Sequence, residues 1–167
     1  MPRCHPLAWI VCAGALVGLR ADETFQIDPQ HASVVFAIKH LNISYQYGRF
    51  NQVQGSAVLN EDDPSKSTFE FSAKTESIDT NNPKRDEHLR GPDFFNAKQF
   101  PEIRFQSTSV QREGNKWVVT GKLTLHGVTK TKRVDLLQLG RAKGLEGESR
   151  IGFISSFDIK RTEFGMN

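Results

Sequence analysis

The stretch that most constrains this chain is residues 77–105, SIDTNNPKRDEHLRGPDFFNAKQFPEIRF, the one long interruption in a sequence that otherwise alternates like β-strand. Asn82 can accept a backbone hydrogen bond as a helix N-cap, and Pro83 suits the first helical position. Gly91 offers a left-handed residue and Pro92 prevents continuation. The pattern predicts a short helix over residues 83–90, in which Asp86 is spaced to pair with Arg90 on the surface.

A second short turn is expected after this helix. Its apolar residues need a surface to cover, so we expect the segment to pack across one end of a β structure. They are Phe94, Phe95, Ala97 and Phe100.

The rest of the chain has the period of two that is typical of strands. About seven strands are predicted, including one long strand over residues 44–60 that bends at Gly48 and Gly55, and a last strand over residues 150–159. Most are joined by short turns, such as residues 113–115 and His126-Gly127. This organisation indicates a single all-β domain, an antiparallel barrel or sandwich, and the glycines and inserted helix favour the barrel.

Large apolar residues on one face of these strands are candidates to line a cavity in the barrel. Small residues among them, such as Ala73 and Gly121, are expected to leave room for one small ligand. The same aromatic residues could equally fill a solid core. The cavity candidates are Val34, Phe36, Ile38, Phe50, Phe69, Phe71, Phe105, Phe153 and Phe157.

Residues 1–21 have the features of a signal peptide. Arg3 precedes an uncharged apolar run over residues 7–19, which is too short for a comfortable membrane span. Removing this segment takes away both cysteines, Cys4 and Cys12, and leaves residues 22–167 with a net charge of about +1. We therefore expect an exported protein without disulfides or thiolate metal ligands, and the charge gives no support for nucleic-acid binding.

Several short sequence motifs occur once each, in a characteristic order and spacing. They begin with Ile27-Asp28-Pro29, Lys39-His40-Leu41 and Gly48-Arg49-Phe50, and end with residues 121–130 and Phe164-Gly165-Met166. Between these lie Ile78-Asp79-Thr80, Arg85-Asp86, His88-Leu89, Asp93-Phe94-Phe95 and Phe100-Pro101. In this order the motifs closely resemble the YceI-like family of bacterial extracytoplasmic proteins, from about Phe25 to the last residue.

The resemblance implies a lipocalin-like β-barrel that binds a polyisoprenoid or similar long-chain lipid, as a carrier or store in the periplasm or outside the cell. It implies no catalytic activity and no cofactor, and it allows transient contact with a membrane. His40, Arg49 and Arg161 are candidates for the lipid head group, because a guanidinium can donate two hydrogen bonds to a phosphate. Family members continue past Phe164-Gly165-Met166 by about one more strand, so the last strand of the barrel is expected to be missing here.

The sequence leaves two other functions open. One is an extracytoplasmic hydrolase that uses His40 or His126, and the other is a stress-related scaffold module without lipid. The histidine spacings match no metal motif, and there is no Gly-x-Ser-x-Gly nucleophile motif or phosphate-binding loop. A structural hydrogen bond is therefore the expected role of each histidine.

We predict that export removes the leader. The protein recovered from an expressing bacterium should have a new N-terminus near Asp22 and no free thiol, because both cysteines lie in the segment that is removed. Intact-mass spectrometry with a thiol-reactive probe measures both properties. A protein that retains Met1 or reacts with the probe would contradict the prediction.

Overall fold

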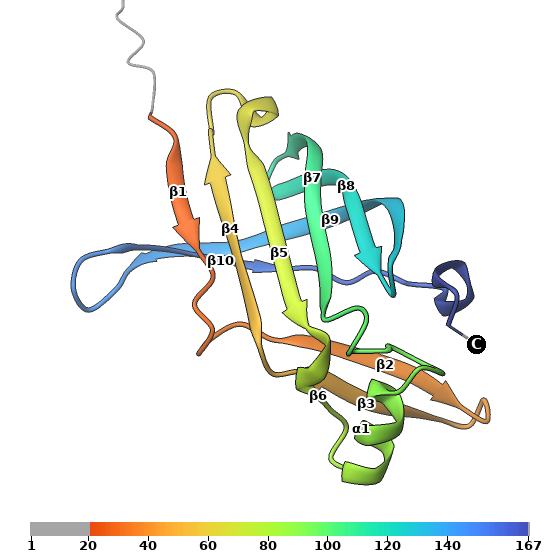
Figure 1. The fold of residues 1–167 in the computed structure, drawn as a ribbon. Helices are drawn as coiled ribbons and strands as arrows, with labels where there is room; N and C mark the ends of the chain where they lie inside the picture. Colours follow the sequence, from red (N-terminus) through yellow and green to blue (C-terminus); the bar gives the residue numbers. More distant parts are fainter. Residues whose placement is uncertain (1–20, 167) are drawn as a thin grey trace, which may run out of the picture.

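The computed structural model describes residues 21–166, which form a nearly closed antiparallel barrel with a single α-helix at one end (Figure 1). The predicted all-β barrel with an inserted helix is confirmed. The signal-peptide prediction and both cysteines lie outside the described residues, apart from Ala21. In the described part, no helix has the length and apolar character needed to cross a bilayer.

The barrel is built from two sheets of antiparallel strands. Seven strands pair in the order β1-β4-β5-β7-β8-β9-β10, and the other three pair as β2-β3-β6. Among the described residues, β1, β10, β2 and β6 each pair on one side only. The strands are β1 (Glu23–Gln26), β2 (Val34–His40), β3 (Ser44–Phe50), β4 (Val53–Leu59), β5 (Thr68–Lys74), β6 (Ile78–Asp79), β7 (Glu102–Glu113), β8 (Lys116–Leu125), β9 (Val128–Lys143) and β10 (Ser149–Ile154).

Two of the predicted strands have different bounds. Residues 44–60 form two strands, because the chain leaves β3 at Asn51 and Gln52 and enters the other sheet as β4. The break therefore does not fall at either glycine. The strand expected over residues 150–159 ends at Ile154, where its pairing with β9 stops opposite Leu137.

The helix α1 (Pro83–Arg90) has the predicted bounds. The Asn82 side chain accepts a hydrogen bond from the Arg85 backbone N–H at 3.1 Å, as expected of an N-cap. The expectation for Gly91 is wrong, since its φ of −71° is not left-handed. The left-handed residues of this segment are Asn81 and Asn96, with φ 59° and 46°. Three short 3₁₀ turns, Pro64–Lys66, Thr75–Ser77 and Arg161–Phe164, complete the helical structure.

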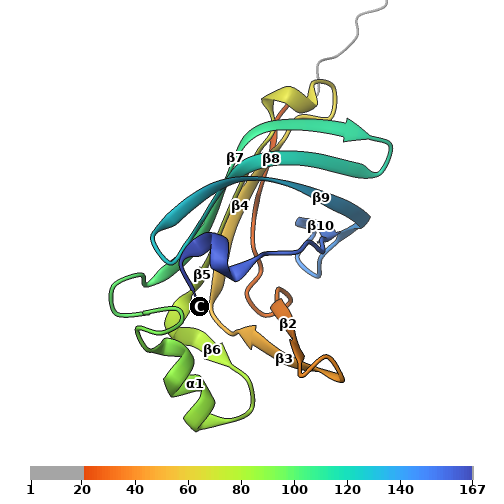
Figure 2. The same ribbon diagram turned by 90° about the vertical axis from the view of Figure 1, so that its right-hand side faces the viewer.

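The helix and the turns that follow it cover the end of the barrel beside β6 and β3 (Figure 2). Backbone bonds connect these turns to the helix, from the Phe95 N–H to the Leu89 carbonyl and from the Ala97 N–H to the Arg90 carbonyl. They place Phe95 against the barrel interior. The predicted packing of this segment across one end is therefore observed.

Asp86 does not form the expected surface pair with Arg90. Its side chain is buried and accepts hydrogen bonds from the backbone N–H and the hydroxyl of Thr80. Arg90 instead donates to the carbonyls of Glu76 and Ile78 at 2.8 and 2.9 Å. Both side chains thus attach α1 to the chain before it, because they satisfy polar groups that the short strand β6 leaves free.

Replacing Asp86 with alanine is predicted to lower the free energy of unfolding by about 1–3 kcal/mol, because buried donors of Thr80 would lose their acceptor. Urea unfolding followed by circular dichroism measures the change. The matched control is Glu87→Ala on the exposed side of the same helix turn, for which a change within about 0.5 kcal/mol is expected. Equal effects of the two substitutions would contradict the role assigned to Asp86.

Candidate ligand-binding site

Aromatic side chains form a continuous row from the three-stranded sheet to the segment after α1. The ring of Phe36 on β2 lies 5.6 Å from that of Phe50 on β3, measured between centroids. Phe50 in turn meets Phe95 edge-on at 5.4 Å. Gly48 makes this packing possible, since a Cβ atom there would lie only 2.4 Å from the Phe36 ring.

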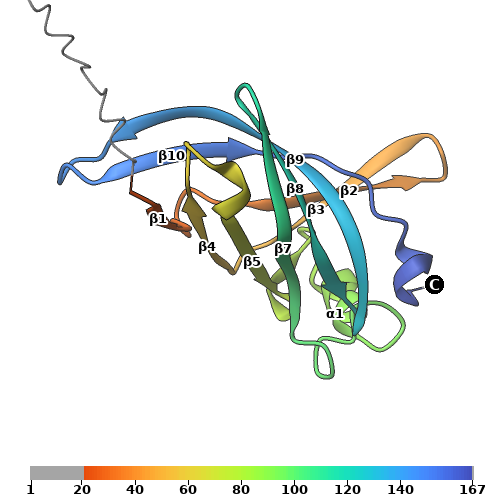
Figure 3. The ribbon, with the colours of Figure 1, turned by 90° about the horizontal axis from the view of Figure 1, so that it is seen from above.

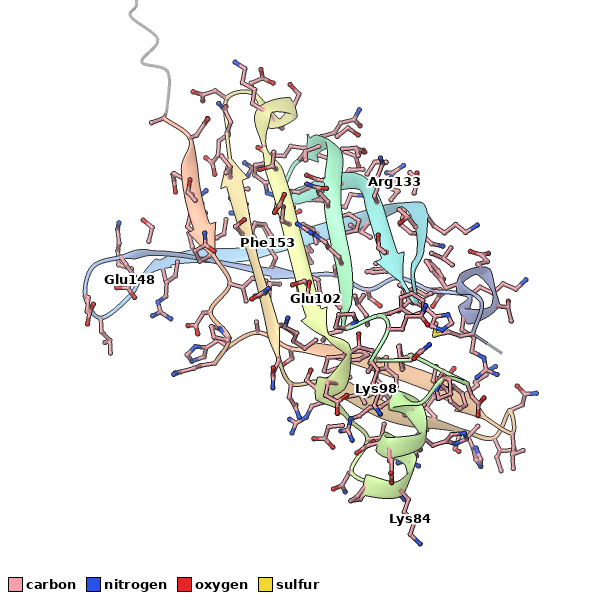
Figure 4. All side chains as sticks on the ribbon, in the orientation of Figure 1. Lys84, Lys98, Glu102, Arg133, Glu148 and Phe153 are labelled. Carbon is pink, nitrogen blue, oxygen red and sulfur yellow. The ribbon has the colours of Figure 1, made fainter. Side chains whose placement is uncertain are left out.

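A second group of aromatic side chains lies inside the seven-stranded sheet. Phe69 on β5 packs edge-on against Trp117 on β8 at 6.0 Å and against Phe153 on β10 at 5.9 Å. Figure 4 labels Phe153, which comes from the opposite side of the barrel. These contacts connect strands that are far apart in the order of the sheet.

The two groups belong to two clusters of buried apolar side chains, which meet through shared neighbours. Phe71, Phe95 and Ile103 are each partly buried and pack against both clusters. The interior of the barrel is therefore apolar along its length, and the part between the two clusters retains some exposed apolar surface.

The nine predicted cavity residues fall into three groups by exposure. Three are buried, four are partly buried against the clusters, and two are exposed. The exposed pair is Ile38, 50% exposed on the inner face of β2, and Phe157, 45% exposed beyond the end of β10. Phe50, Phe69 and Phe105 are the buried members, and Val34, Phe36, Phe71 and Phe153 are the partly buried ones.

The room expected beside Ala73 and Gly121 is not there. Ala73 is 1% exposed. A Cβ atom on Gly121 would lie 2.5 Å from both the Gln106 carbonyl oxygen and the Phe105 ring. These small residues allow close packing of neighbouring strands instead of opening a cavity, so the two positions are unsuitable for blocking one.

Arg49, a predicted head-group residue, lies on the outer face of β3. Its guanidinium contacts the Asp79 carboxylate on β6 at 3.3 and 3.4 Å. Asp79 also accepts hydrogen bonds from the Asn81 backbone N–H and the Asn51 side chain. The Asn81 N–H, followed by Asn51 and Arg49, lowers the pKa of the Asp79 carboxyl from its ordinary value of 3.8.

A surface pocket of about 580 Å³ lies beside β3, where the chain leaves β6, and Arg49 and Arg85 both line it. Arg85 donates hydrogen bonds to the Thr80 hydroxyl and carbonyl, each at 2.7 Å. The sequence did not single out Asn81 or the joint position of the two arginines. The motifs that contain Asp79-Thr80 and Arg85-Asp86 could have indicated that this region forms a site.

The other two head-group candidates do not join this pocket in the structure. His40 is exposed at the end of β2, opposite Ser44, and Arg161 is exposed in the last 3₁₀ turn. Within residues 21–166, no hydrogen bond or ion pair connects either of them with Arg49 or with each other. Their role toward a ligand stays a prediction.

The histidines take part in local contacts. His126 lies 3.0 Å from the Phe164 carbonyl through Nδ1, and its ring packs edge-on against Phe100. His31 pairs with Asp28 at 2.8 Å, and His88 lies 3.4 Å from Asp93. In the described part of the chain, no three histidine, cysteine or acidic side chains gather as they would to hold a metal ion.

This fold and its apolar interior match a known family. The model of the YceI-like domain matches residues 25–167, and the chain belongs to this family. A relative from Photorhabdus laumondii, named UPF0312 protein, is 41% identical over 159 residues, which cover 92% of this chain and 83% of the relative. The UPF0312 protein of Pectobacterium atrosepticum is 38% identical, with 92% and 80% covered.

Solved structures show the same architecture. The YceI protein of Campylobacter jejuni superimposes with a TM-score of 0.68 and 34% identity, over 84% of this chain and 82% of that protein. BcnA of Burkholderia cenocepacia gives a TM-score of 0.75 at 23% identity, over 84% of each chain, which shows the shared fold.

The Asp79 contacts predict a pH-dependent difference in stability. The folded state favours the charged form of Asp79. Its contribution to the free energy of unfolding is therefore fully present above the ordinary pKa of the carboxyl, and it is lost as the pH falls through the lower pKa of the folded protein. Asp79→Asn should therefore lower the thermal midpoint at neutral pH, and the gap to the unchanged protein should close in acid. Asp158→Asn, which removes an exposed carboxylate, is the control. A gap that does not vary with pH would contradict this account.

Proposed function

We propose that this protein is an exported lipid-binding protein of the YceI-like family. It holds a long-chain isoprenoid or a similar lipid against the apolar interior of its barrel, outside the cytoplasm, and serves as a carrier or store. The apolar run over residues 7–19 supports export. The resemblance of the chain to its family suggests the class of lipid.

The observation that carries this proposal is the incomplete burial of the interior side chains that pack against the two clusters. Val34, Phe36, Phe71 and Phe153 pack against buried neighbours yet keep exposed surface. Covering apolar surface stabilises a complex by roughly 25 cal/mol per Å², so an elongated apolar ligand is favoured at this place. A long acyl or isoprenoid chain would reach both clusters at once.

The chemistry of the interior also supports binding over catalysis. The residues that pack into the two clusters are aliphatic and aromatic, and these supply neither a nucleophile nor a base. Specificity for a head group would have to come from polar residues outside the clusters. Arg49 and Arg85 in the pocket beside β3, together with His40 and Arg161, are the available candidates.

Changing the polarity of the inner face tests the proposal. Phe36→Asn should reduce the lipid that co-purifies with the protein at least several-fold, because an amide would replace an apolar contact surface. Ala142→Asn is the matched control, since Ala142 is an exposed strand alanine of the β9–β10 hairpin. Organic extraction followed by mass spectrometry quantifies the lipid in each protein.

Val34→Thr provides a second variant with almost unchanged shape, in case Phe36→Asn folds poorly. Circular dichroism and the thermal midpoint establish that each variant is folded. If the unchanged protein yields no long-chain lipid on extraction, the lipid-binding function is contradicted. Equal lipid content in the Phe36, Val34 and Ala142 variants would instead place the lipid elsewhere.

A further inference from the structure

The hairpin formed by β2 and β3 ends in an exposed apolar turn. It extends to one side of the molecule past α1, opposite the end of the β9–β10 hairpin (Figures 1 and 3). The turn consists of Leu41, Asn42 and Ile43, here named the hairpin tip. Leu41 is 76% exposed and Ile43 is 81% exposed, so neither side chain contributes to the core.

The backbone conformation of the tip is one in which apolar residues are unusual. Leu41 and Asn42 have φ values of +50° and +60°, and the Ile43 N–H donates to the His40 carbonyl at 3.0 Å. Tight turns of this kind favour glycine, asparagine or aspartate, because a left-handed conformation strains larger side chains. A leucine at this position therefore gains nothing from the turn geometry or from core packing.

The outer face of the same hairpin carries further apolar and aromatic surface. Val35, Ala37, Tyr45 and Tyr47 are all exposed, and the two tyrosine rings lie 6.4 Å apart. They share this face because Ala37 pairs with Tyr47 and Lys39 with Tyr45, while Phe36 and Phe50 point into the barrel. We name Val35, Ala37, Tyr45 and Tyr47 the outer patch.

The charged side chains of the hairpin itself are all basic. No aspartate or glutamate occurs in the sequence between Asp28 and Glu61, whereas Lys39 and Arg49 flank the outer patch. Arg85 lines the same pocket as Arg49. Asp79 is the acidic residue that meets Arg49, and the Asp86 carboxylate is buried against Thr80. The surface presented by the hairpin is thus apolar and basic.

From this arrangement we propose that the hairpin tip and the outer patch dock on an anionic lipid bilayer. Leucine and isoleucine side chains would enter the boundary of the acyl region, the tyrosines would lie at the level of the head groups, and Lys39 would face anionic lipid. The pairing of β2 with β3 and the bond from the Ile43 N–H to the His40 carbonyl hold the tip together. A shallow insertion at the level of the head groups keeps the unpaired edges of both strands in contact with water.

A bilayer fits this surface better than a protein groove does. The tip protrudes from the molecule on a tight turn (Figure 1), and the positive charge of the hairpin is complementary to anionic lipid. The inner face of the same strand carries Phe36 and the half-exposed Ile38, so docking would bring the inner face close to the membrane. This inference rests on the proposed function, because it supplies the route by which a lipid would be exchanged.

Co-sedimentation with vesicles tests the docking surface. The exported protein is mixed with vesicles of phosphatidylethanolamine and phosphatidylglycerol, or of phosphatidylcholine alone. Binding to the anionic vesicles is expected, with a marked decrease in high salt. Replacing both Leu41 and Ile43 with asparagine should weaken binding at least about tenfold, because two apolar side chains no longer enter the bilayer. Lys39→Gln should reduce binding to the anionic vesicles and leave any binding to phosphatidylcholine vesicles unchanged.

The matched control is Leu145→Asn. Leu145 is a fully exposed leucine in the turn between β9 and β10, and its replacement should leave vesicle binding unchanged. Every variant has the same N-terminus, so any contribution of residues 1–21 cancels. Asparagine suits the left-handed conformation of Leu41, and Ile43 is exposed, so the double variant should remain folded.

Three results would overturn the proposal. The first is equal vesicle binding by the double variant and the unchanged protein. The second is binding to neutral vesicles as strong as binding to anionic ones. The third is a protein that self-associates through the tip, seen by light scattering as a dimer that the double variant abolishes. Lipid extracted from the same preparations tests the proposed function separately. A protein that contains lipid but does not bind vesicles contradicts the docking surface, and a protein that binds vesicles but contains no lipid contradicts the proposed function.

Discussion

The structure depends on the packing of one partly buried layer, Phe71, Phe95 and Ile103, between two apolar clusters inside a strongly curved sheet. Phe71 and Ile103 come from neighbouring strands, but Phe95 comes from the segment after α1, so the barrel interior is complete only when that segment is in place. The bonds of Asp86 to Thr80 and of Arg90 to the carbonyls of Glu76 and Ile78 hold it there. A small number of polar contacts thus supports the apolar surface that a ligand would meet.

The two faces of the β2–β3 hairpin lie in different environments, the barrel interior on one side and the molecular surface on the other. Phe36 and Phe50 face the interior, and the tyrosines and Arg49 face outward, because the side chains of a strand alternate. Gly48 keeps the two strands close by leaving space for the Phe36 ring. Lipid binding on the inner face and membrane contact on the outer face can therefore depend on the same structural element without sharing side chains.

Sequence signals correctly predicted the elements that depend on interactions between residues close together in the chain. Asn82 and Pro83 located the start of α1, and the turns expected at Gly114 and His126-Gly127 are present, with left-handed φ values. Contacts between distant residues were less predictable. The bond of Asp86 to Thr80 depends on where α1 docks, and the burial of Gly121 depends on the Phe105 ring across the sheet. Arg49 was recognised as a candidate, but its outward direction follows from a strand register that the sequence does not specify.

Native mass spectrometry of the protein purified without detergent tests the central claim most directly. The account predicts a species that is heavier than the chain by the mass of a long-chain lipid, in stoichiometric amount, and that loses this excess after organic extraction. A native protein with the mass of the bare chain, obtained from a bacterium that makes such lipids, would contradict the account.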